Sequence, residues 1–486
     1  MRYYSTRNKN EAASFAQAAL AGLAPDGGLY VPQEIPQYAQ AVKSSLGTMD
    51  YRDIAFETIK PYVHDEIPDS TLRDIVQSAY TFTAPLIGVL DRYVLELFHG
   101  PTAAFKDFGA RFMARAFAWL RRGEEKPLRI LVATSGDTGG AVADGFFDVP
   151  GISVTVLYPK GRVTPLQERQ IAGLGKNISA LAVEGSFDDC QRLVKAALAD
   201  TGLKKRMTLS SANSINISRL IPQAVYYAAA AGRAFAGRLD PDGDATPRKS
   251  LSAFTLEFAE QTPRDGKTQS DQRSVTGENL HSLSTNHYPL TTSLIPVTLC
   301  VPSGNFGNLT AGLYAMKMGA PIRRFIAATN INKTVPDFLD SGEYLARVSQ
   351  ATISNAMDVG APSNFERMAA HFSWEEMRRI LLGVSVSDNE TQQAIVRVHD
   401  QAGYFLDPHS AVGWCAVDKL RAENKLDPMD TEPVGVLCTA HPAKFSEVVQ
   451  PLVGPAPVPP SLARAMERSV CSQTIPAEVS ALLDAL

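Results

Sequence analysis

Lys106 stands in a stretch whose residue types suit covalent chemistry by an amine. It follows a Gly-Pro turn, two alanines and a phenylalanine in the run His99–Asp107, and an apolar helical pattern begins directly after it. Small and aromatic neighbours at a helix start remove water from an amine, which lowers its pKa and frees it to form a Schiff base. Asp107 is predicted to cap that helix. We therefore take Lys106 as the candidate catalytic residue, although a single lysine more often keeps its charge in water at the surface.

Two glycine-containing loops, each between a predicted strand and a predicted helix, have the composition of anion-binding turns. Their small residues let successive N–H groups converge at a helix N-terminus, where the helix dipole favours negative charge. One such loop is common in α/β proteins without any ligand. Two of them beside a Schiff-base lysine indicate a ligand set with more than one anionic group, such as pyridoxal phosphate with an amino-acid substrate. The loops are Thr134-Ser135-Gly136-Asp137-Thr138-Gly139-Gly140 and Pro302-Ser303-Gly304-Asn305-Phe306-Gly307-Asn308.

Other reactive patterns in the sequence are weaker. The eight histidines have no metal-binding spacing, so we predict no metal site, and neither a GxSxG nor a GxGxxG motif occurs. Gly266-Lys267-Thr268 imitates the end of a P-loop, but Gln261 stands where its first glycine is needed. We expect His99 and His441 to be hydrogen-bonded structural residues rather than ligand-binding ones.

The elements that must position these residues alternate between strand and helix. Short β-branched runs at Ile130–Ala133, Ile152–Tyr158 and Ile178–Val183 are separated by helical patterns, and the alternation returns over 296–328. This order predicts an α/β fold with parallel strands and right-handed crossovers. Further helices are predicted over 10–22, 217–235, 374–382 and 391–401, and further strands at Tyr3–Tyr4 and Val434–Leu437.

The predicted elements divide the chain into four regions. A polar segment over 239–294, rich in Asp, Ser, Thr and Gln, interrupts one of them, and we expect this insertion to be flexible. The predicted regions are an N-terminal module (1–90), a large cofactor-binding domain (91–128 and 236–460), a small α/β domain (129–235) and a C-terminal helical tail (461–486).

Composition excludes several classes of protein. The 486 residues carry a net charge of −4, so nothing favours a nucleic-acid partner. No apolar run approaches the ~20 residues of a membrane span, and the first residues lack the apolar segment of a secretory signal. The five cysteines are far apart, which favours a reducing compartment over a disulfide framework. We therefore expect a cytoplasmic protein without membrane contact.

The motifs occur together in an order that resembles the threonine synthase family of fold type II pyridoxal-phosphate enzymes. The resemblance covers roughly 1–238 and 296–450. Two departures are Asn308, where members often carry an acidic residue, and the length of the 239–294 insertion. The motifs that carry the resemblance are the segments 22–32, 99–107, 135–139, 213–216, 302–307 and 439–445.

The resemblance implies a fold, a cofactor and a reaction. The fold has two open, mostly parallel, twisted sheets flanked by helices, plus a mixed N-terminal module. The cofactor is pyridoxal 5'-phosphate, held covalently by Lys106, which also moves protons, while Thr439 offers its hydroxyl to the pyridine nitrogen. The reaction converts O-phosphohomoserine and water to threonine and phosphate. The implied phosphate cradle is Gly304, Asn305, Phe306, Gly307 and Asn308, and the implied substrate contacts are Ser135, Gly136, Asp137, Thr138, Gly139, Asn213 and Asn216.

Two other functions are compatible with some of the same motifs. A related dehydratase-type lyase acting on serine or threonine would share the cofactor, but its shorter relatives lack the N-terminal 22–32 signature. A non-catalytic homologue would have lost the lysine or the phosphate loop, and both are present. The residues that hold the substrate phosphate are unassigned, with Lys160, Arg162 and Arg219 as candidates, and the chain is expected to be a monomer or a homodimer.

Overall fold

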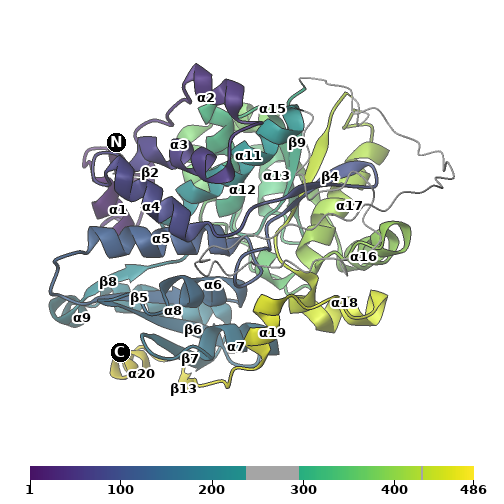
Figure 1. Cartoon of the computed structure of the whole chain (residues 1–486). Coiled ribbons are helices and arrows are strands. Elements are labelled where there is room, and N and C mark those ends of the chain that lie inside the picture. The colour runs from purple at the N-terminus through teal and green to yellow at the C-terminus, as the bar shows by residue number, and fades with distance from the viewer. Residues whose placement is uncertain (237–294, 428–430) are drawn as a thin grey trace, which may run out of the picture.

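Two mostly parallel sheets and one small antiparallel sheet organise the chain (Figure 1). The computed structural model describes residues 1–236, 295–427 and 431–486. The predicted flexible insertion at 239–294 lies outside the described residues. This arrangement confirms the predicted α/β fold, whereas the proposed domain boundaries remain predictions.

The larger sheet has six strands, of which only the edge strand β3 (Leu86–Val89) runs antiparallel to its neighbour. The remaining pairs are parallel. Consequently, the carboxyl ends of its central strands lie on one edge. From one side of the sheet to the other the strands are β11 (Leu381–Ser385), β10 (Ile322–Thr329), β9 (Val297–Pro302), β12 (Val434–Cys438), β4 (Arg92–Glu96) and β3.

The smaller sheet has five parallel strands. Its edge strand β13 (Gln473–Pro476) comes from the C-terminal tail, which was predicted to be only helical. This strand closes the side of β7 (Ile178–Glu184), so the end of the chain belongs to the small sheet. The other strands, in spatial order after β7, are β6 (Ile152–Pro159), β5 (Leu128–Ala133) and β8 (Thr208–Ser211).

Helix α5 (Lys106–Leu120) forms the centre of the molecule because its apolar residues recur at helical spacing. Phe108, Phe112 and Phe117 are fully buried. The helix packs against α4 (Asp69–Ala79), α6 (Asp137–Phe146) and α10 (Ile217–Leu220). It therefore connects the N-terminal module to the small sheet, as Figure 1 shows.

The remaining helices cover the sheets or form the N-terminal module, where β1 (Tyr3–Ser5) pairs antiparallel with β2 (Tyr30–Pro32). The module contains α1 (Phe15–Ala21), α2 (Gln40–Ser45) and α3 (Tyr51–Val63). On or beside the small sheet lie α7 (Pro165–Ala172), α8 (Phe187–Ala199), α9 (Thr201–Arg206) and α20 (Val479–Ala485). The others are α11 (Ala224–Phe235), α12 (Gly307–Met318), α13 (Thr334–Ser341), α14 (Phe365–His371), α15 (Trp374–Ile380), α16 (Asp388–Ala402), α17 (Pro408–Ala422), α18 (Ser446–Val453) and α19 (Pro460–Met466), with short 3₁₀ turns η1 (Ile221–Gln223), η3 (Asn355–Met357) and η4 (Pro442–Phe445).

Three predicted helices differ from the observed ones for local reasons. The helix predicted over 10–22 begins at Phe15 because Ser14 caps it. The helix predicted over 217–235 is divided by η1, which contains Pro222 and so lacks one N–H donor. The helix predicted over 374–382 ends at Ile380, and the unpredicted strand β11 follows at once.

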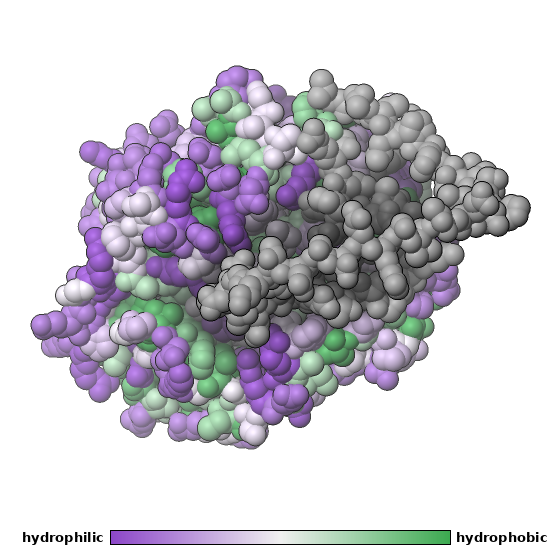
Figure 2. Space-filling view, in the orientation of Figure 1, coloured by the Kyte–Doolittle hydropathy of each residue, from purple (hydrophilic) through white to green (hydrophobic). Residues whose placement is uncertain are grey.

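The surface of the described residues is mixed. On the face drawn in Figure 2, hydrophilic residues predominate over the N-terminal helices and hydrophobic ones gather in small groups. Within the described ranges, every helix is too short or too polar to cross a membrane.

We predict that Gly109→Ala destabilises the protein. A Cβ at Gly109 would lie 2.7 Å from the carbonyl oxygen of Arg219, so α5 or α10 would have to shift. Such overpacking costs about 1–3 kcal/mol, which exceeds the gain of about 1 kcal/mol from replacing a helical glycine. The measurement is the midpoint of thermal unfolding. The matched control is Gly202→Ala in α9, where the nearest atom is a side-chain carboxylate oxygen of Asp200 at 3.1 Å rather than backbone; equal midpoints for the two variants would contradict the prediction.

Candidate active site

The lysine-bearing loop is held by backbone pairing to the segment after β12. The N–H of Phe105 donates to the carbonyl of Thr439 at 2.8 Å, and the N–H of His441 donates to the carbonyl of Ala103 at 3.0 Å. Ala103 adopts a positive φ of 53°, which turns the chain toward the helix. These contacts fix where α5 begins, and Lys106 is its first residue.

Asp107 closes the same loop from inside, which corrects the prediction that it caps the helix. The helix begins two residues earlier than predicted, with Phe105 rather than Asp107 at the N-cap position, so Asp107 lies in the first turn. Its carboxylate accepts hydrogen bonds from the Thr102 N–H at 2.9 Å and from the Thr102 hydroxyl. A Cβ at Gly100 would meet this carboxylate at 2.4 Å, which accounts for the glycine. Burial raises the pKa of Asp107 to about 6.

Lys106 lines a cavity of about 530 Å³ at the carboxyl ends of strands from both parallel sheets. The last residues of β5, β8 and β9, which are Ala133, Ser211 and Pro302, line it, as does Thr439 after β12. Ligands of open α/β sheets bind at this edge, and cavities of roughly 300–1,000 Å³ hold cofactors and small substrates. The sequence-predicted loops therefore meet at one cavity.

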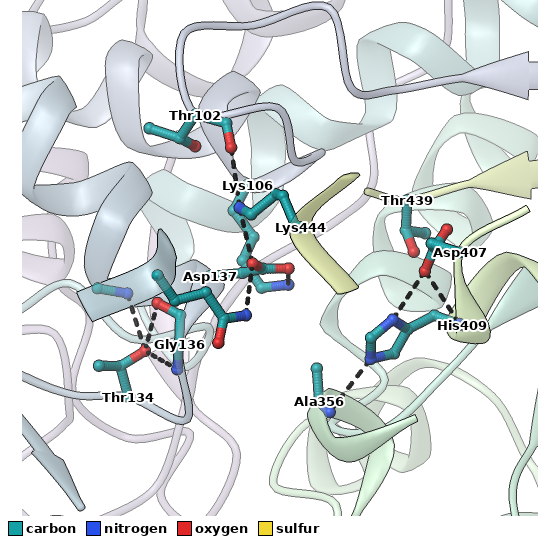
Figure 3. Close-up of polar contacts among 12 residues, drawn as sticks. Thr102, Lys106, Thr134, Gly136, Asp137, Ala356, Asp407, His409, Thr439 and Lys444 are labelled. Carbon is teal, nitrogen blue, oxygen red and sulfur yellow. Dashed lines mark hydrogen bonds and ion pairs between the residues drawn. The ribbon is translucent and has the colours of Figure 1, made fainter. Parts of the chain in front are cut away.

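The first predicted loop, between β5 and α6, is shaped by the hydroxyl of Thr134. That oxygen accepts hydrogen bonds from the N–H groups of Gly136 at 2.9 Å and Gly139 at 2.8 Å (Figure 3). Gly136 has a φ of 137°, and a Cβ there would lie 2.4 Å from Gln167. The two glycines thus bend the loop without lining the cavity, whereas Ser135, Asp137 and Thr138 line it.

The second predicted loop, between β9 and α12, lines the cavity along its whole length. Phe306 is in the left-handed region, with a φ of 57°, at the N-cap position of α12. A Cβ at Gly304 would lie 2.7 Å from the carbonyl oxygen of Ala356 in η3, so only glycine fits. The start of the twelve-residue helix α12 therefore faces the cavity, where its free N–H groups favour an anion. The lining residues are Pro302, Ser303, Gly304, Asn305, Phe306, Gly307 and Asn308.

Asn308, which lines the cavity, has a side-chain donor that is unpartnered within the described residues. Its side-chain oxygen accepts hydrogen bonds from the hydroxyls of Tyr226 and of Tyr227, the latter at 2.8 Å. Its buried amide nitrogen, in contrast, has no hydrogen-bond partner among the described residues. Because an unsatisfied buried donor is costly, this nitrogen is suited to a polar ligand.

Asp137 is the electrostatic centre of the site (Figure 3). Its carboxylate lies 2.7 Å from the Lys444 Nζ and 3.7 Å from the Lys106 Nζ, and it accepts a hydrogen bond from the Gln167 amide at 3.0 Å. Burial alone would raise the pKa of Asp137, but the two ammonium groups outweigh it and hold the pKa far below its ordinary value. Asp137 is therefore ionised in the folded protein.

The pKa of Lys106 is itself shifted from its ordinary value. Its side chain is 14% exposed, and burial lowers its pKa to about 8. The nearby charges of Lys444 and Arg219 lower this pKa further, while that of Asp137 opposes the change. A substantial fraction of the Lys106 amine is consequently neutral near physiological pH, as a nucleophile or base requires.

The structure adds a cavity-lining histidine that our sequence analysis missed. The Nδ1 of His409 donates to the Asp407 carboxylate at 2.8 Å, and its Nε2 accepts the N–H of Ala356 at 3.2 Å (Figure 3). The imidazole therefore ties the start of α17 to η3, beside Gly304. The signal in the sequence was Asp407-Pro408-His409, an N-cap followed by proline at a helix start.

Of the two predicted asparagines, only Asn213 lines the cavity. Its amide donates to the carbonyl of Ala133 at 2.7 Å. Asn216 is fully buried and does not line the cavity. Its amide donates to the carbonyls of Ala19 and Ser211, at 2.8 and 2.9 Å, so it ties α1 to β8. The expectation that Asn216 contacts the substrate is thus corrected to a structural role.

The three basic candidates for a substrate phosphate are placed differently. Lys160 is exposed, pairs with Glu184 at 3.2 Å and does not line the cavity, whereas Arg162 and Arg219 do. Arg219 is buried, and its Nε has no hydrogen-bond partner among the described residues. Burial lowers the pKa of Arg219 to about 10, which leaves the guanidinium charged.

The two histidines expected to be structural lie outside the cavity lining. The Nε2 of His99 lies 2.7 Å from the buried Glu96 carboxylate. His441 packs edge-on against Phe98 and accepts the N–H of Ala443 at 3.2 Å. Burial lowers the pKa of His441 to about 4, so this imidazole is neutral.

The site's groups fit a pyridoxal phosphate. A partly neutral lysine amine suits the aldehyde, the start of α12 and the unpartnered amide of Asn308 suit a phosphate, and the Thr439 hydroxyl suits a ring nitrogen. No cluster of potential metal ligands occurs among the residues with described positions.

Comparison with known families assigns nearly the whole sequence. Residues 2–80 match the threonine synthase N terminus family, and residues 410–485 match the threonine synthase C-terminal family. Residues 90–231 and 291–439 match the pyridoxal-phosphate dependent enzyme family. The two threonine synthase families thus flank the part that carries Lys106 and both loops.

Individual relatives match this chain over nearly its full length. Threonine synthase from Escherichia coli (strain K12) is 38% identical over 99% of this chain and 98% of its own length. A crystal structure of threonine synthase from Escherichia coli, 37% identical, superposes with a TM-score of 0.80, covering 100% of this chain and 99% of that one. A pyridoxal-phosphate-bound threonine synthase from Brucella melitensis has 33% identity and a TM-score of 0.80, covering 100% and 98% of the two chains. The chain therefore belongs to the threonine synthase family of pyridoxal-phosphate-dependent enzymes.

Proposed function

We propose that this protein converts O-phospho-L-homoserine and water to L-threonine and phosphate. The observation that carries the proposal is the largely shielded Lys106 amine, held 3.7 Å from Asp137 in a cavity that the α12 loop also lines. Membership of the threonine synthase family supports the choice of reaction.

We assign the cofactor contacts by chemistry. Lys106 would bind the aldehyde carbon, and the backbone N–H groups of Gly304 to Asn308, with the Asn308 amide, would hold the phosphate. Thr439 would hydrogen-bond the pyridine nitrogen with its hydroxyl. When bound, pyridoxal phosphate supplies an electron sink for bond breaking at the substrate carbons.

The protein's own groups then handle protons and orientation. Lys106 removes and returns protons at the substrate Cα and Cβ, for which a pKa of about 8 is well matched. Ser135 and Thr138 offer hydroxyls, and Asn213 an amide edge, to the substrate carboxylate. Gly136 and Gly139 take part only by bending the loop that presents Ser135 and Thr138.

We assign the substrate phosphate to Arg219, with Arg162 as the second candidate. A buried guanidinium with one unpartnered N–H is suited to a charged acceptor. Lys160 is set aside because it is exposed, paired with Glu184 and outside the cavity lining.

Serine or threonine dehydration is the alternative reaction. It would use the same lysine and phosphate loop, so the central family match alone does not separate the two. The matches of residues 2–80 and 410–485 to threonine synthase families favour our choice.

We further propose that the protein acts in the cytoplasm as a monomer or homodimer. All five cysteines are free and four are buried, which suits a reducing compartment.

We predict that the cofactor-bound protein releases threonine and phosphate in equal amounts from O-phospho-L-homoserine. Phosphate is measured colorimetrically and the amino acid by chromatography. Serine and threonine, offered separately, serve as controls. Ammonia and a keto acid from either of these amino acids, without phosphate release from O-phospho-L-homoserine, would favour the dehydratase instead.

Lys106→Ala is predicted to remove the visible absorbance band of the bound cofactor and all turnover, because the covalent link and the proton carrier are lost together. Borohydride treatment and peptide mapping should label Lys106 in the natural protein. The matched control is Lys160→Ala, an exposed lysine outside the cavity, which should keep both band and label. A band that survives in Lys106→Ala would refute the assignment of this amine.

Arg219→Met is predicted to raise KM for O-phospho-L-homoserine by about 10–100-fold, because a hydrogen bond to a charged group contributes about 1.5–3 kcal/mol. Its cofactor absorbance should stay as in the natural protein, since the lysine and phosphate loop are untouched. Lys160→Met is the control of matched charge loss. An unchanged KM in Arg219→Met with a raised KM in Arg162→Met would transfer the phosphate contact to Arg162.

A further inference from the structure

Lys444 is a buried cation to which the proposed reaction gives no task. Its side chain is 0% exposed, although lysines almost always keep their charge in water. Its Nζ donates to the carbonyl oxygen of Thr102 at 2.8 Å and lies 2.7 Å from the Asp137 Oδ1 (Figure 3). Lys444 thus joins η4 to both the lysine-bearing loop and the first loop.

Two lysines compete for the one carboxylate. Lys444 reaches Oδ1 of Asp137 at hydrogen-bond distance, while Lys106 lies 3.7 Å from Oδ2. The closer pair is the stronger one, because the attraction falls with distance and the charge-assisted hydrogen bond exists only at the shorter range. Lys106 is therefore the amine whose proton is held less firmly.

We propose that Lys444 is a positioning residue that sets the charge of Lys106. By occupying the Asp137 carboxylate, Lys444 increases the fraction of the Lys106 amine that is neutral and nucleophilic near physiological pH. This inference rests on the proposed function of Lys106 as the cofactor-binding amine, and it adds a group that acts together with burial to favour the neutral amine.

The other charged groups around Lys106 are compatible with this role. They are Asp137 on α6, Lys444 on η4, Arg219 on α10 and Asp407 at the start of α17. Counted together with Lys106, and with both lysines protonated, these groups carry a net charge of plus one. Loss of one proton makes the cluster of five neutral. The proton leaves from Lys106, because Lys444 donates to two oxygens and Lys106 to neither of them.

The contact to Thr102 adds a mechanical link. Its carbonyl oxygen accepts from Lys444 and also from the Gln170 amide of α7, at 3.1 Å. Since Thr102 also binds the Asp107 carboxylate, the position of the loop and the charge of its lysine depend on the same buried residues. A charge effect and a purely structural effect of Lys444 must therefore be separated by experiment.

The test measures the ionisation of Lys106 directly, in the full chain freed of cofactor. Trace acetic anhydride is applied over a range of pH, and acetylation of the Lys106 peptide is followed by mass spectrometry. Lys444→Gln keeps two N–H donors but removes the charge. Lys444→Met removes the donors and the charge, and Lys444→Arg keeps the charge. The exposed Lys160 in the same sample is the internal control.

We expect Lys444→Gln and Lys444→Met to raise the midpoint of Lys106 labelling by about one pH unit or more, which slows labelling near neutral pH about tenfold. Lys444→Arg should resemble the natural protein, and Lys160 should be unchanged throughout. Equal midpoints in the natural protein and in both neutral variants, or a Lys444→Arg midpoint as high as theirs, would overturn the proposal.

The natural protein alone provides a test if the variants fail to fold. A Lys106 midpoint at or above that of the exposed Lys160 would overturn the proposal without any variant. Failure of the proposed function looks different, because borohydride would then trap the cofactor on another lysine. If borohydride traps the cofactor on Lys106 but the pH midpoint of Lys106 acetylation equals that of an exposed lysine, only the role of Lys444 is refuted.

Discussion

A carboxylate buried between two lysines is the constraint on which the rest of the site depends. Asp137 could not remain ionised in this interior without a partner, because an uncompensated buried charge costs several kcal/mol. A single lysine could compensate the charge of Asp137, but the ion pair would keep that lysine protonated and therefore unreactive. With two lysines present, Lys444 compensates the charge of Asp137 at 2.7 Å. Lys106 lies near the same carboxylate but beyond hydrogen-bond distance.

The topology brings these three residues together from distant parts of the chain. Lys106 follows β4 and Lys444 follows β12, and the two strands are parallel neighbours in the larger sheet. Past the strand ends, an isolated antiparallel bridge between Ala104 and Ala440 joins the two segments that follow these strands. Asp137 is the first residue of α6 and follows the loop after β5 of the smaller sheet. The cluster therefore forms only when the carboxyl edges of both sheets face each other.

Sequence patterns could predict the parts of this site that are local. The turn before Lys106 and both glycine loops are contiguous, so composition and spacing reveal them. Lys444 lay within a recognised motif, but nothing local distinguishes a buried lysine from a surface one, because its burial depends on Thr102 and Asp137 far away in sequence. For the same reason β11 and β13 were missed: their pairing partners, not their own residues, make them strands.

The charge balance also explains how an anionic ligand can enter a cavity that contains a carboxylate. A phosphate and an amino-acid carboxylate would both be repelled by an exposed Asp137. Lys444 compensates that charge, and Lys106, Arg219 and the first N–H groups of α12 remain in the lining as groups that attract an anion. The same ion pair that frees one amine for chemistry thus also weakens the repulsion between Asp137 and an anionic ligand, so ligand binding and lysine reactivity have a common physical origin.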